Sequence, residues 1–397
     1  MHLLLTYDFP PIPGGISRWM GELARRYPAH ELVVSTGQHP DSQDTDPQFG
    51  VTVDRVPISA RRLRTIQGLL LWSRRAATLA RLHRPSFTWC GNLKPAAYPA
   101  KWVRERVGVP YGAIVHGTDL LLLQHRIHQS VVKRRAAQAL LQSASVLVAN
   151  SRWTRNLCLT VLNELGLKAN DTQVRTVPLG TDPGHFRPGV DTDAVRARYR
   201  LPRGRYLVTV ARLAAHKGID TVLRVVATLA REVPELRYAV VGSGQKQEEL
   251  ETLARELGVA DRVHFLTDVP DRDLPALYNL AEVYLGVSRP AELMIEGFGI
   301  ALTEASACGV PVVAGTSGGM PDAVRDGETG LLVDSESVEA VTGAVRRLLE
   351  DRELARRLGA EGRRAVETFY NWDRVTAELR DIAEEFSRRP APRRAAR

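Results

Sequence analysis

Residues 206–210 read Tyr-Leu-Val-Thr-Val, and the eight residues after them read Ala-Arg-Leu-Ala-Ala-His-Lys-Gly. The apolar run has the length and the β-branched content of a buried strand, and the charged residues and glycine end it. An amphipathic segment long enough for a helix comes next. This order of strand, loop and helix is the repeating unit of parallel-sheet α/β domains.

The same unit recurs along the whole chain, which at 397 residues suits two domains. The expected architecture is therefore α/β, with two Rossmann-like domains. The strands expected in the first half are 3–7, 31–35, 52–55, 111–115, 146–149 and 173–177, and those in the second half are 206–210, 238–241, 263–265, 283–286 and 310–314.

Residues 178–205 are rich in Gly, Pro, Asp and Arg and have weak periodicity, which favours an interdomain linker. We therefore predict an N-terminal domain at 1–180 and a C-terminal domain at 181–371. A last helix is expected at 372–387, followed by a disordered basic tail at 388–397.

The amino-acid composition of the chain is that of a globular protein. Hydrophobic residues make up 44% of the chain and charged residues 25%, which is typical of a globular protein. The three cysteines are far apart in the sequence and predict neither a disulfide framework nor a metal cluster. The apolar run at the N-terminus is too short for a signal peptide, and no run approaches the length of a membrane span, so we expect a cytoplasmic protein.

The positive charge is concentrated in the first half of the chain. Residues 1–180 hold 23 Lys and Arg against 11 Asp and Glu, whereas the remainder holds 31 against 34. This asymmetry suggests that the first half meets a polyanionic surface, or that it is simply rich in arginine.

Two loops that follow predicted strands are candidate phosphate sites. Gly14 and Gly15 stand between the first strand and a helix, where backbone amides can approach a phosphate, although a Gly-Gly pair also makes an ordinary tight corner. Arg212 and Lys217 follow the first strand of the second domain and can converge on one diphosphate.

A third candidate loop, which carries two glycines, follows the predicted strand at 238–241. It reads Gly-Ser-Gly, with Gly242 and Gly244 on either side of the serine. Their place after a second-domain strand makes both glycines candidate nucleotide contacts, although the motif by itself is a weak one. We include them among the candidate donor-binding residues.

Residues 296–304 read Glu-Gly-Phe-Gly-Ile-Ala-Leu-Thr-Glu and form the most specific segment of the chain. Its glycines permit close backbone approach, and a helix beginning at about Ile300 would point amides at a phosphate. Glu304 falls in an otherwise apolar stretch, where a carboxylate needs a partner, and a ribose diol is a natural one.

The first domain contributes candidates at two predicted strand ends. His116 closes the strand at 111–115 and could bond a sugar hydroxyl, with Asp119 close behind it. Residues 150–155 read Asn-Ser-Arg-Trp-Thr-Arg and follow another strand, with Ser151 suited to cap a helix. We take Asp119, Asn150, Arg152 and Arg155 as candidate acceptor contacts, although the two arginines could merely decorate a helix start.

Taken together, these motifs resemble the family-4 retaining glycosyltransferases of GT-B fold, over essentially the whole chain. The paired glutamates around Gly-Phe-Gly are the specific part of the resemblance. Residues 294–300, residues 314–319 and the opening Asp-Phe-Pro-Pro at 8–11 are most similar to the phosphatidylinositol-mannoside mannosyltransferases and their relatives.

The resemblance implies two domains that face each other across a cleft, with the C-terminal helix crossing back to the first domain. It also implies a nucleotide-sugar co-substrate, either GDP-mannose or a UDP-sugar, and a lipid, polysaccharide or small-molecule acceptor. Arg212 and Lys217 would hold the donor diphosphate, together with Gly15 of the other domain. The backbone amides that complete this phosphate cradle would be those of Phe298, Gly299 and Ile300.

The same resemblance places Glu296 on the hydroxyls of the transferred sugar, Glu304 on the ribose and His116 near the reaction centre. It implies that the new bond forms on the face from which the diphosphate leaves, so that the anomeric configuration is retained. We expect no metal and no cofactor, because none of the Asp-x-Asp pairs at 44/46, 191/193 and 271/273 directly follows a predicted strand.

Residues 61–84 combine clustered arginines with Leu, Ile and Trp at helical spacing. They could form a peripheral contact with an anionic membrane, or an ordinary helix whose apolar face is core.

Two other classes of function make different demands on the sequence. A GT-B-fold epimerase or phosphorylase would need its own acid/base set or a cofactor lysine. A nucleic-acid-binding protein would interleave aromatic and basic residues in a known module, which we do not find, so no nucleic-acid partner is expected.

Overall fold

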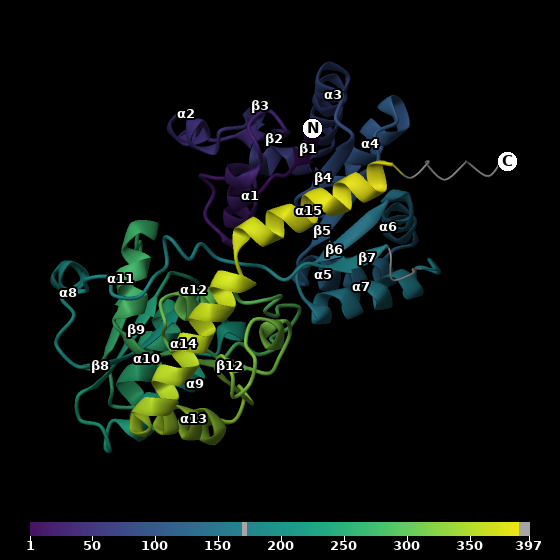
Figure 1. The fold of residues 1–397 in the computed structure, drawn as a ribbon. Helices are drawn as coiled ribbons and strands as arrows, with labels where there is room; N and C mark the ends of the chain where they lie inside the picture. Colours follow the sequence, from purple (N-terminus) through teal and green to yellow (C-terminus); the bar gives the residue numbers. More distant parts are fainter. Residues whose placement is uncertain (169–172, 389–397) are drawn as a thin grey trace. The chain divides into compact units, whose positions relative to one another are not determined.

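The computed structural model describes residues 1–168 and 173–388, and these divide into two compact units (Figure 1). Unit 1 comprises residues 1–177 together with the chain from Trp372 onward, and unit 2 comprises residues 178–371. Residues 389–397 of the predicted disordered tail lie outside the described residues.

Unit 1 is built on a sheet of seven strands in the order β3-β2-β1-β4-β5-β6-β7, with every neighbouring pair parallel. Its strands are β1 (His2–Leu5), β2 (Leu32–Gln38), β3 (Thr52–Ser59), β4 (Phe87–Cys90), β5 (Tyr111–Val115), β6 (Val146–Ala149) and β7 (Val174–Thr176). Its helices are α1 (Gly15–Arg26), α2 (Ser42–Thr45), η1 (Asp46–Phe49), η2 (Ala60–Arg64), α3 (Ile66–His83), α4 (Ala97–Val107), α5 (Thr118–Gln129), α6 (Val131–Ser143), α7 (Arg152–Glu164) and α15 (Trp372–Ser387).

Unit 2 repeats this architecture with a six-stranded parallel sheet in the order β10-β9-β8-β11-β12-β13. Its strands are β8 (Arg205–Val210), β9 (Leu236–Val241), β10 (Val263–Leu266), β11 (Ala281–Gly286), β12 (Val312–Gly315) and β13 (Leu331–Val333). Its helices are α8 (Asp193–Arg198), η3 (Ala215–Lys217), α9 (Ile219–Leu229), α10 (Gln247–Glu256), η4 (Asp271–Asp273), α11 (Leu274–Asn279), α12 (Ile300–Ala307), η5 (Met320–Asp322), α13 (Val338–Glu350) and α14 (Arg352–Thr368).

Burial on both faces explains why the strands read as continuous apolar runs. All four residues of β1 are buried. Leu3 and Leu5 belong to the core cluster beneath α3 and α4, and strand alternation turns Leu4 to the opposite face, where it is equally buried. A parallel sheet covered by helices on both sides requires this pattern.

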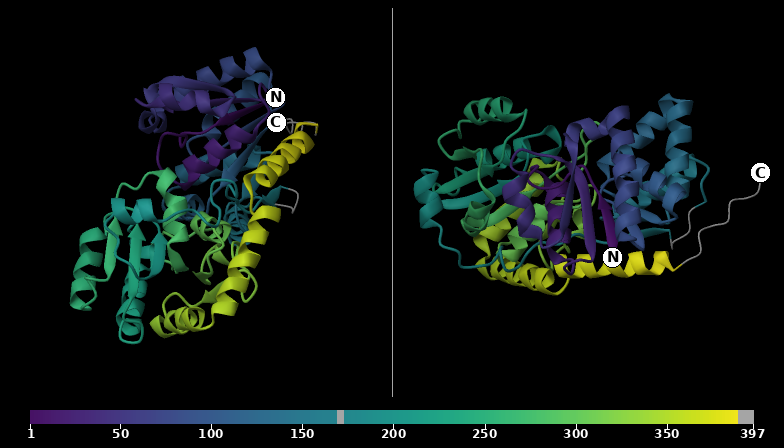
Figure 2. Two further views of the ribbon diagram at one scale, coloured as in Figure 1. Left: turned by 60° about the vertical axis from the view of Figure 1, so that its left-hand side comes forward. Right: turned by 90° about the horizontal axis from the view of Figure 1, so that it is seen from above.

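The last helix, α15, belongs to unit 1, although the chain enters it directly from unit 2. It packs against α1 and β4, and Figure 2 shows it in yellow along the unit-1 sheet. Arg380 ties it down, since its guanidinium pairs with Glu31 at 2.7 Å and lies over the Tyr27 ring. The return of the C-terminal helix to the first domain is therefore confirmed.

Three sequence-based expectations need correction. Strands β4 and β13, of four and three residues, were not predicted, although the equally short strands β6 and β7 were. The stretch 178–205 is not a free linker, since it belongs to unit 2, contains α8 and ends in the first residue of β8. The units divide at 177/178, three residues before the predicted boundary.

Candidate active site

The carboxyl ends of β8 and β11 meet in unit 2, because these strands are neighbours in a parallel sheet. Ligands of open α/β sheets bind at such ends. The loop after β8 carries Arg212 and Lys217, and the long loop after β11 carries Glu296. The backbone joins the two loops directly, since the Arg289 amide donates to the His216 carbonyl at 2.8 Å.

Lys217 and Glu296 form an ion pair, although they are 79 residues apart in the sequence. The Lys217 ammonium donates to Oε2 of Glu296 at 2.5 Å. Both side chains are largely buried, with 16% and 22% of their surface exposed. A short contact between partly desolvated charges is strong. The two residues assigned to the diphosphate and to the sugar thus occupy one site.

Electrostatics keep Glu296 ionised in this site. Burial alone would raise the pKa of Glu296, but the ammonium of Lys217, with a smaller effect from Arg212, brings that pKa below its ordinary value. The carboxylate is therefore available at neutral pH as a hydrogen-bond acceptor for sugar hydroxyls.

His216 stays neutral beside this pair. Its side chain is buried, and burial, reinforced by the charge of Lys217, lowers its pKa from 6.5 to about 4. Between these two pH values the unfolded chain binds a proton that the folded chain does not, so the free energy of unfolding falls as the pH falls. His2, buried in unit 1, has a pKa lowered to about 4 for the same principal reason.

We expect unit 2 to lose about 2 kcal/mol of stability through His216 between pH 7 and pH 5. Hydrogen exchange of β8 amides should report this loss, and His216→Gln should remove it from unit 2. His2→Gln is the matched control, since it should act on unit 1 alone. An unchanged pH dependence of unit 2 in His216→Gln would contradict the assignment.

The backbone around Glu296 is held by a loop that follows β12. The Gly319 amide donates to the Glu296 carbonyl at 2.9 Å, and Gly318 adopts a φ of +61°. A Cβ atom at Gly318 would lie 2.2 Å from the Glu296 carbonyl oxygen. Only glycine fits this position, because a side chain would both strain the left-handed backbone and collide with the segment that carries the carboxylate.

Three amide donors lie at the start of α12. The backbone N–H groups of Phe298, Gly299 and Ile300 donate no hydrogen bond within residues 1–168 and 173–388. A Cβ on Gly299 would lie 3.7 Å from Cγ of Glu296, so these amides are close to the ion pair. The helix begins at Ile300 as predicted. Amides at a helix start, next to a lysine, are a suitable cradle for a phosphate.

Glu304 lies on the second turn of α12 and is 3% exposed, which confirms that this carboxylate is buried. The hydroxyl of Tyr278, at the end of α11, donates to its Oε2 at 2.6 Å. The sequence did not point to Tyr278, because α11 is six residues long and the residue reads as ordinary core.

Gly242 and Gly244 follow β9 and pack closely against the loop after β8. The Leu213 amide donates to the Ser243 carbonyl at 3.0 Å. A Cβ on Gly242 would lie 2.1 Å from the Ala211 carbonyl oxygen, and one on Gly244 would lie 2.3 Å from the Leu213 carbonyl oxygen. The close approach that requires these two glycines is therefore to the neighbouring loop. A contact of Gly242 or Gly244 with the nucleotide stays a prediction.

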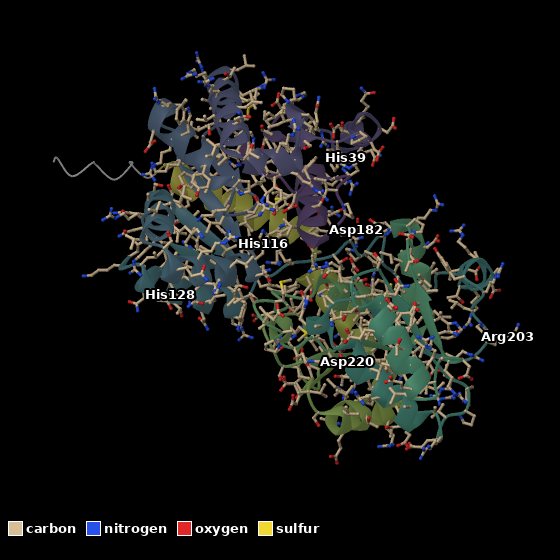
Figure 3. The ribbon with its side chains drawn as sticks, turned by 180° about the vertical axis from the view of Figure 1, so that it is seen from behind. His39, His116, His128, Asp182, Arg203 and Asp220 are labelled. Carbon is tan, nitrogen blue, oxygen red and sulfur yellow. The ribbon has the colours of Figure 1, made fainter. Side chains whose placement is uncertain are left out.

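Two further charged residues lie on the same sheet edge. Arg212 is exposed, and its guanidinium makes no hydrogen bond or ion pair with the described part of the chain. Asp220, labelled in Figure 3, lies in the first turn of α9 and pairs with Arg289 at 2.7 Å. This ion pair anchors the loop after β11, whereas Arg212 is left available for a ligand.

In unit 1, His116 lies at the carboxyl end of β5 and is labelled in Figure 3. Its Nε2 is 2.7 Å from the Gly91 carbonyl, and the Trp19 ring meets its ring edge-on at 5.2 Å. A carbonyl only accepts, so Nε2 must carry a proton and donate it. Nδ1 is the ring nitrogen that remains for contact with a hydroxyl.

The acceptor candidates of unit 1 have structural roles as well. Asp119 lies in the first turn of α5, where its Oδ1 accepts from the amides of His116 and Leu120, and its Oδ2 is buried without a partner among the described residues. Ser151 caps α7 as predicted, by accepting from the Thr154 amide at 3.1 Å. Its neighbour Asn150 is buried, with an Oδ1 that also lacks a partner within the described residues.

The two arginines of α7 differ in exposure. Arg152 is exposed at the first position of the helix, whereas Arg155 is partly covered and donates from Nε to the Val174 carbonyl at 3.3 Å. Gly14 and Gly15 are exposed at the start of α1, where Gly14 occupies the cap position and the helix begins with Gly15.

Sequence reasoning missed Asp8 and Asn92, which lie next to His116. The Asn92 amide donates to Oδ2 of Asp8 at 3.0 Å. Burial raises the pKa of Asp8, and hydrogen bonds from Tyr7 and Asn92 and the charge of His116 oppose this only in part. Asn92 follows β4, so failure to predict that strand hid the polar residue at its end. A polar residue two positions after the apolar run was the available signal.

The Asp-x-Asp pairs contain carboxylates that are already bonded. Asp46 is held by Arg55 at 2.6 Å and Asp273 by Arg198 at 2.5 Å. Within residues 1–168 and 173–388, no three His, Cys, Asp or Glu side chains come together as metal ligands.

Comparisons with known proteins agree with this geometry. Residues 13–185 match the family model described as Glycosyltransferase Family 4, and residues 191–365 match Glycosyl transferases group 1. The chain is 34% identical to the GDP-mannose-dependent alpha-(1-6)-phosphatidylinositol monomannoside mannosyltransferase of Mycolicibacterium smegmatis, over 96% of this chain and 97% of that protein. It is 30% identical to a D-inositol 3-phosphate glycosyltransferase of Streptomyces scabiei, over 93% of this chain and 86% of that protein.

Among solved structures, sucrose-phosphate synthase from Thermosynechococcus elongatus matches with a TM-score of 0.78 and 22% identity, over 97% of this chain and 98% of that one. Two parallel-sheet Rossmann-like units therefore define a glycosyltransferase fold of GT-B type. The chain belongs to glycosyltransferase family 4 and stands near its phosphatidylinositol-mannoside mannosyltransferases. It is a glycosyltransferase.

Proposed function

We propose that this protein transfers mannose from GDP-mannose to a phosphatidylinositol mannoside, with retention of configuration and without a metal ion. The observation that carries the proposal is the Lys217–Glu296 pair beside the amides of residues 298–300. Support for the donor and acceptor comes from a relative of nearly equal length, whose name contains both. Such a role would fall within the biosynthesis of cell-envelope glycans.

The donor diphosphate would lie on the α12 amides and Lys217, with the exposed Arg212 as a further cation. As the bond from C1 of the sugar to the diphosphate oxygen breaks, negative charge develops on that oxygen. Fixed cations and amide dipoles stabilise this charge without reorganising. The acceptor hydroxyl forms the new bond to C1, and its proton passes to the departing phosphate oxygen. Glu296 would hold the sugar hydroxyls during this step, and Glu304 would hold the ribose.

The same charge balance supports the proposed independence of a metal ion. The pair of Lys217 and Glu296 is neutral as a whole, so the net positive charge must come from Arg212 and the amide dipoles. In a partly desolvated site these donors act at a lower effective dielectric constant than in water. The proposal gives them the role that a divalent cation has in metal-dependent transferases.

The decisive experiment is an activity assay with GDP-mannose, UDP-glucose and UDP-GlcNAc, each with and without EDTA. We expect turnover with GDP-mannose and phosphatidylinositol monomannoside, unchanged by EDTA, and an NMR spectrum of the product that shows the donor's anomeric configuration. Turnover with a UDP-sugar alone would replace the donor assignment. Loss of turnover in EDTA would overturn the metal-independent mechanism.

A second candidate acceptor is free D-inositol 3-phosphate. A relative named D-inositol 3-phosphate glycosyltransferase matches 93% of the chain. Its named acceptor and the phosphatidylinositol acceptor in the name of the mycobacterial relative both contain an inositol phosphate. Parallel assays with inositol 3-phosphate in solution and with the lipid in vesicles distinguish the two candidates. We expect the lipid to be used at least tenfold more efficiently.

We also propose peripheral binding of unit 1 to anionic membrane. No helix among the described residues is long and apolar enough to cross a bilayer. The apolar face of α3 is core around Trp72, but Ile66 and Leu70 are 79% and 48% exposed. They border a hollow of about 330 Å³ between α3 and α4, next to the exposed arginines of η2. Apolar and basic groups together suit an anionic lipid surface.

Flotation with vesicles tests this surface. We expect binding to anionic vesicles and none to zwitterionic ones, and loss of about tenfold in affinity when Ile66 and Leu70 are both changed to Glu. Phe369→Glu is the control, because Phe369 is also exposed, at 41%, but lies in unit 2. Equal binding of all three proteins would contradict the proposal.

A further inference from the structure

Tyr278 and Glu304 form a hydrogen bond in which both the donor and the acceptor side chain are almost fully buried. Tyr278 has none of its surface exposed, and Glu304 has 3%. The hydroxyl donates to Oε2 at 2.6 Å, from α11 to α12. A buried carboxylate is costly unless donors satisfy it, and the Tyr278 hydroxyl supplies one such donor.

The bond also fixes an orientation. The last torsion of a glutamate is broad, so an unrestrained carboxylate rotates easily. A donor on one oxygen sets the plane of the group and the direction of its remaining lone pairs. A carboxylate offers about four acceptor positions, so acceptance from Tyr278 leaves capacity for the hydroxyls of a ligand.

Tyr278 is itself held from two sides. Its ring meets Phe186 edge-on at 5.6 Å and an interplanar angle of 80°, and it packs against Tyr284 at 5.6 Å. The adjacent Asn279 ties the end of α11 to the chain at 187–190, since it donates to the Arg187 carbonyl at 2.9 Å and accepts from the Val190 amide at 3.3 Å. The phenol hydroxyl therefore has a fixed position in unit 2.

We propose that Tyr278 is the positioning residue that orients Glu304 toward a ribose diol, and that it thereby sets the enzyme's preference for ribonucleotide over deoxyribonucleotide donors. This rests on the proposed function, in which Glu304 binds the ribose. Tyr278 does not contact the sugar or the reacting atoms. Its effect passes through the carboxylate, and it should therefore appear in donor binding and not in the chemical step.

The test compares ligands that differ by one hydroxyl. Calorimetric titration with GDP, 2′-deoxy-GDP and 3′-deoxy-GDP should show that the wild type binds GDP at least tenfold more tightly than one of the deoxy forms, as expected for a hydrogen bond to a charged group. In Tyr278→Phe this ratio should fall to about threefold or less, because GDP binding weakens while deoxy-GDP binding does not. UDP and 2′-deoxy-UDP form a parallel arm for a uridine donor.

Tyr284→Phe is the matched control. Tyr284 is an equally buried tyrosine in contact with Tyr278, but its hydroxyl donates to the Val210 carbonyl at 3.3 Å. It should keep the wild-type ratio. In turnover, Tyr278→Phe should raise the KM for the donor about tenfold and leave kcat within about twofold, because an interaction of equal strength in the ground and transition states affects KM alone.

The results of these titrations distinguish a failure of the positioning role of Tyr278 from a failure of the proposed function. A wild type that binds no nucleoside diphosphate would overturn the proposed function. Tight binding of GDP with no preference over either deoxy form, or a preference unchanged in Tyr278→Phe, would overturn the positioning role alone. If Tyr278→Phe does not fold, Phe186→Leu keeps the hydroxyl but removes the ring contact that fixes it, and this variant should still lower the ratio. An unchanged ratio there would also overturn the inference.

Discussion

Lys217→Ala is expected to lower kcat/KM by about 100- to 1,000-fold, which is the usual effect of removing one preorganised donor from a developing negative charge. In the proposed mechanism Lys217 contributes twice, because its ammonium would neutralise the leaving diphosphate and also holds Glu296 in place through the 2.5 Å contact. Steady-state kinetics with the donor varied measure the loss. Most of it should appear in kcat, since the charge is largest in the transition state.

Two comparisons sharpen this prediction. Lys246→Ala removes an exposed lysine of the same unit, which pairs with Glu249 at 2.5 Å, and should leave turnover unchanged. Glu296→Gln keeps the shape of the carboxylate and should cost about 100-fold. Because the two residues act as a unit, the double variant should lose far less than the product of the single losses. Fully multiplicative losses would show that the ion pair has no role in turnover.

Gly318→Ala is expected to lower the free energy of unfolding by about 3 kcal/mol and kcat/KM by about 100-fold. The added Cβ strains a backbone at φ +61° and meets the Glu296 carbonyl oxygen at 2.2 Å, so the segment that carries Glu296 must move. A displacement of about 1 Å at a catalytic group is sufficient for a loss of this size. Denaturant unfolding and donor kinetics measure the two effects.

Gly327→Ala is the control matched for backbone conformation. Gly327 has a φ of +69°, but a Cβ there would meet nothing within 4 Å. This variant should lose about 1 kcal/mol through strain alone and keep its activity. Equal losses of activity in the two variants would mean that the close approach at Gly318 does not position Glu296.

The proposed donor site contains an ion pair that the donor would have to share. In the absence of donor, Lys217 and Glu296 satisfy each other, and so neither is left as a buried unpaired charge. A diphosphate on one side and sugar hydroxyls on the other can add to this pair without breaking it, because an ammonium has three donors and a carboxylate has further lone pairs. Binding then requires little reorganisation of the protein.

The sequence by itself determined the features that depend on local pattern. Strands at 111–115 and 146–149 and the helix start at Ile300 have the predicted bounds, because apolar runs and glycine breaks encode them directly. The buried state of Glu304 also followed from its apolar neighbours. The glycosyltransferase class came from motifs of this kind.

Tertiary structure decided what depends on distance along the chain. No local pattern joins Lys217 to Glu296 or Tyr278 to Glu304, because these contacts arise only when parallel strands and their following loops become neighbours. The places of β4 and β13 in their sheets depend on pairing with neighbouring strands, which the order of residues along the chain does not specify. Sequence periodicity places each residue within its own element, whereas packing alone sets which elements meet.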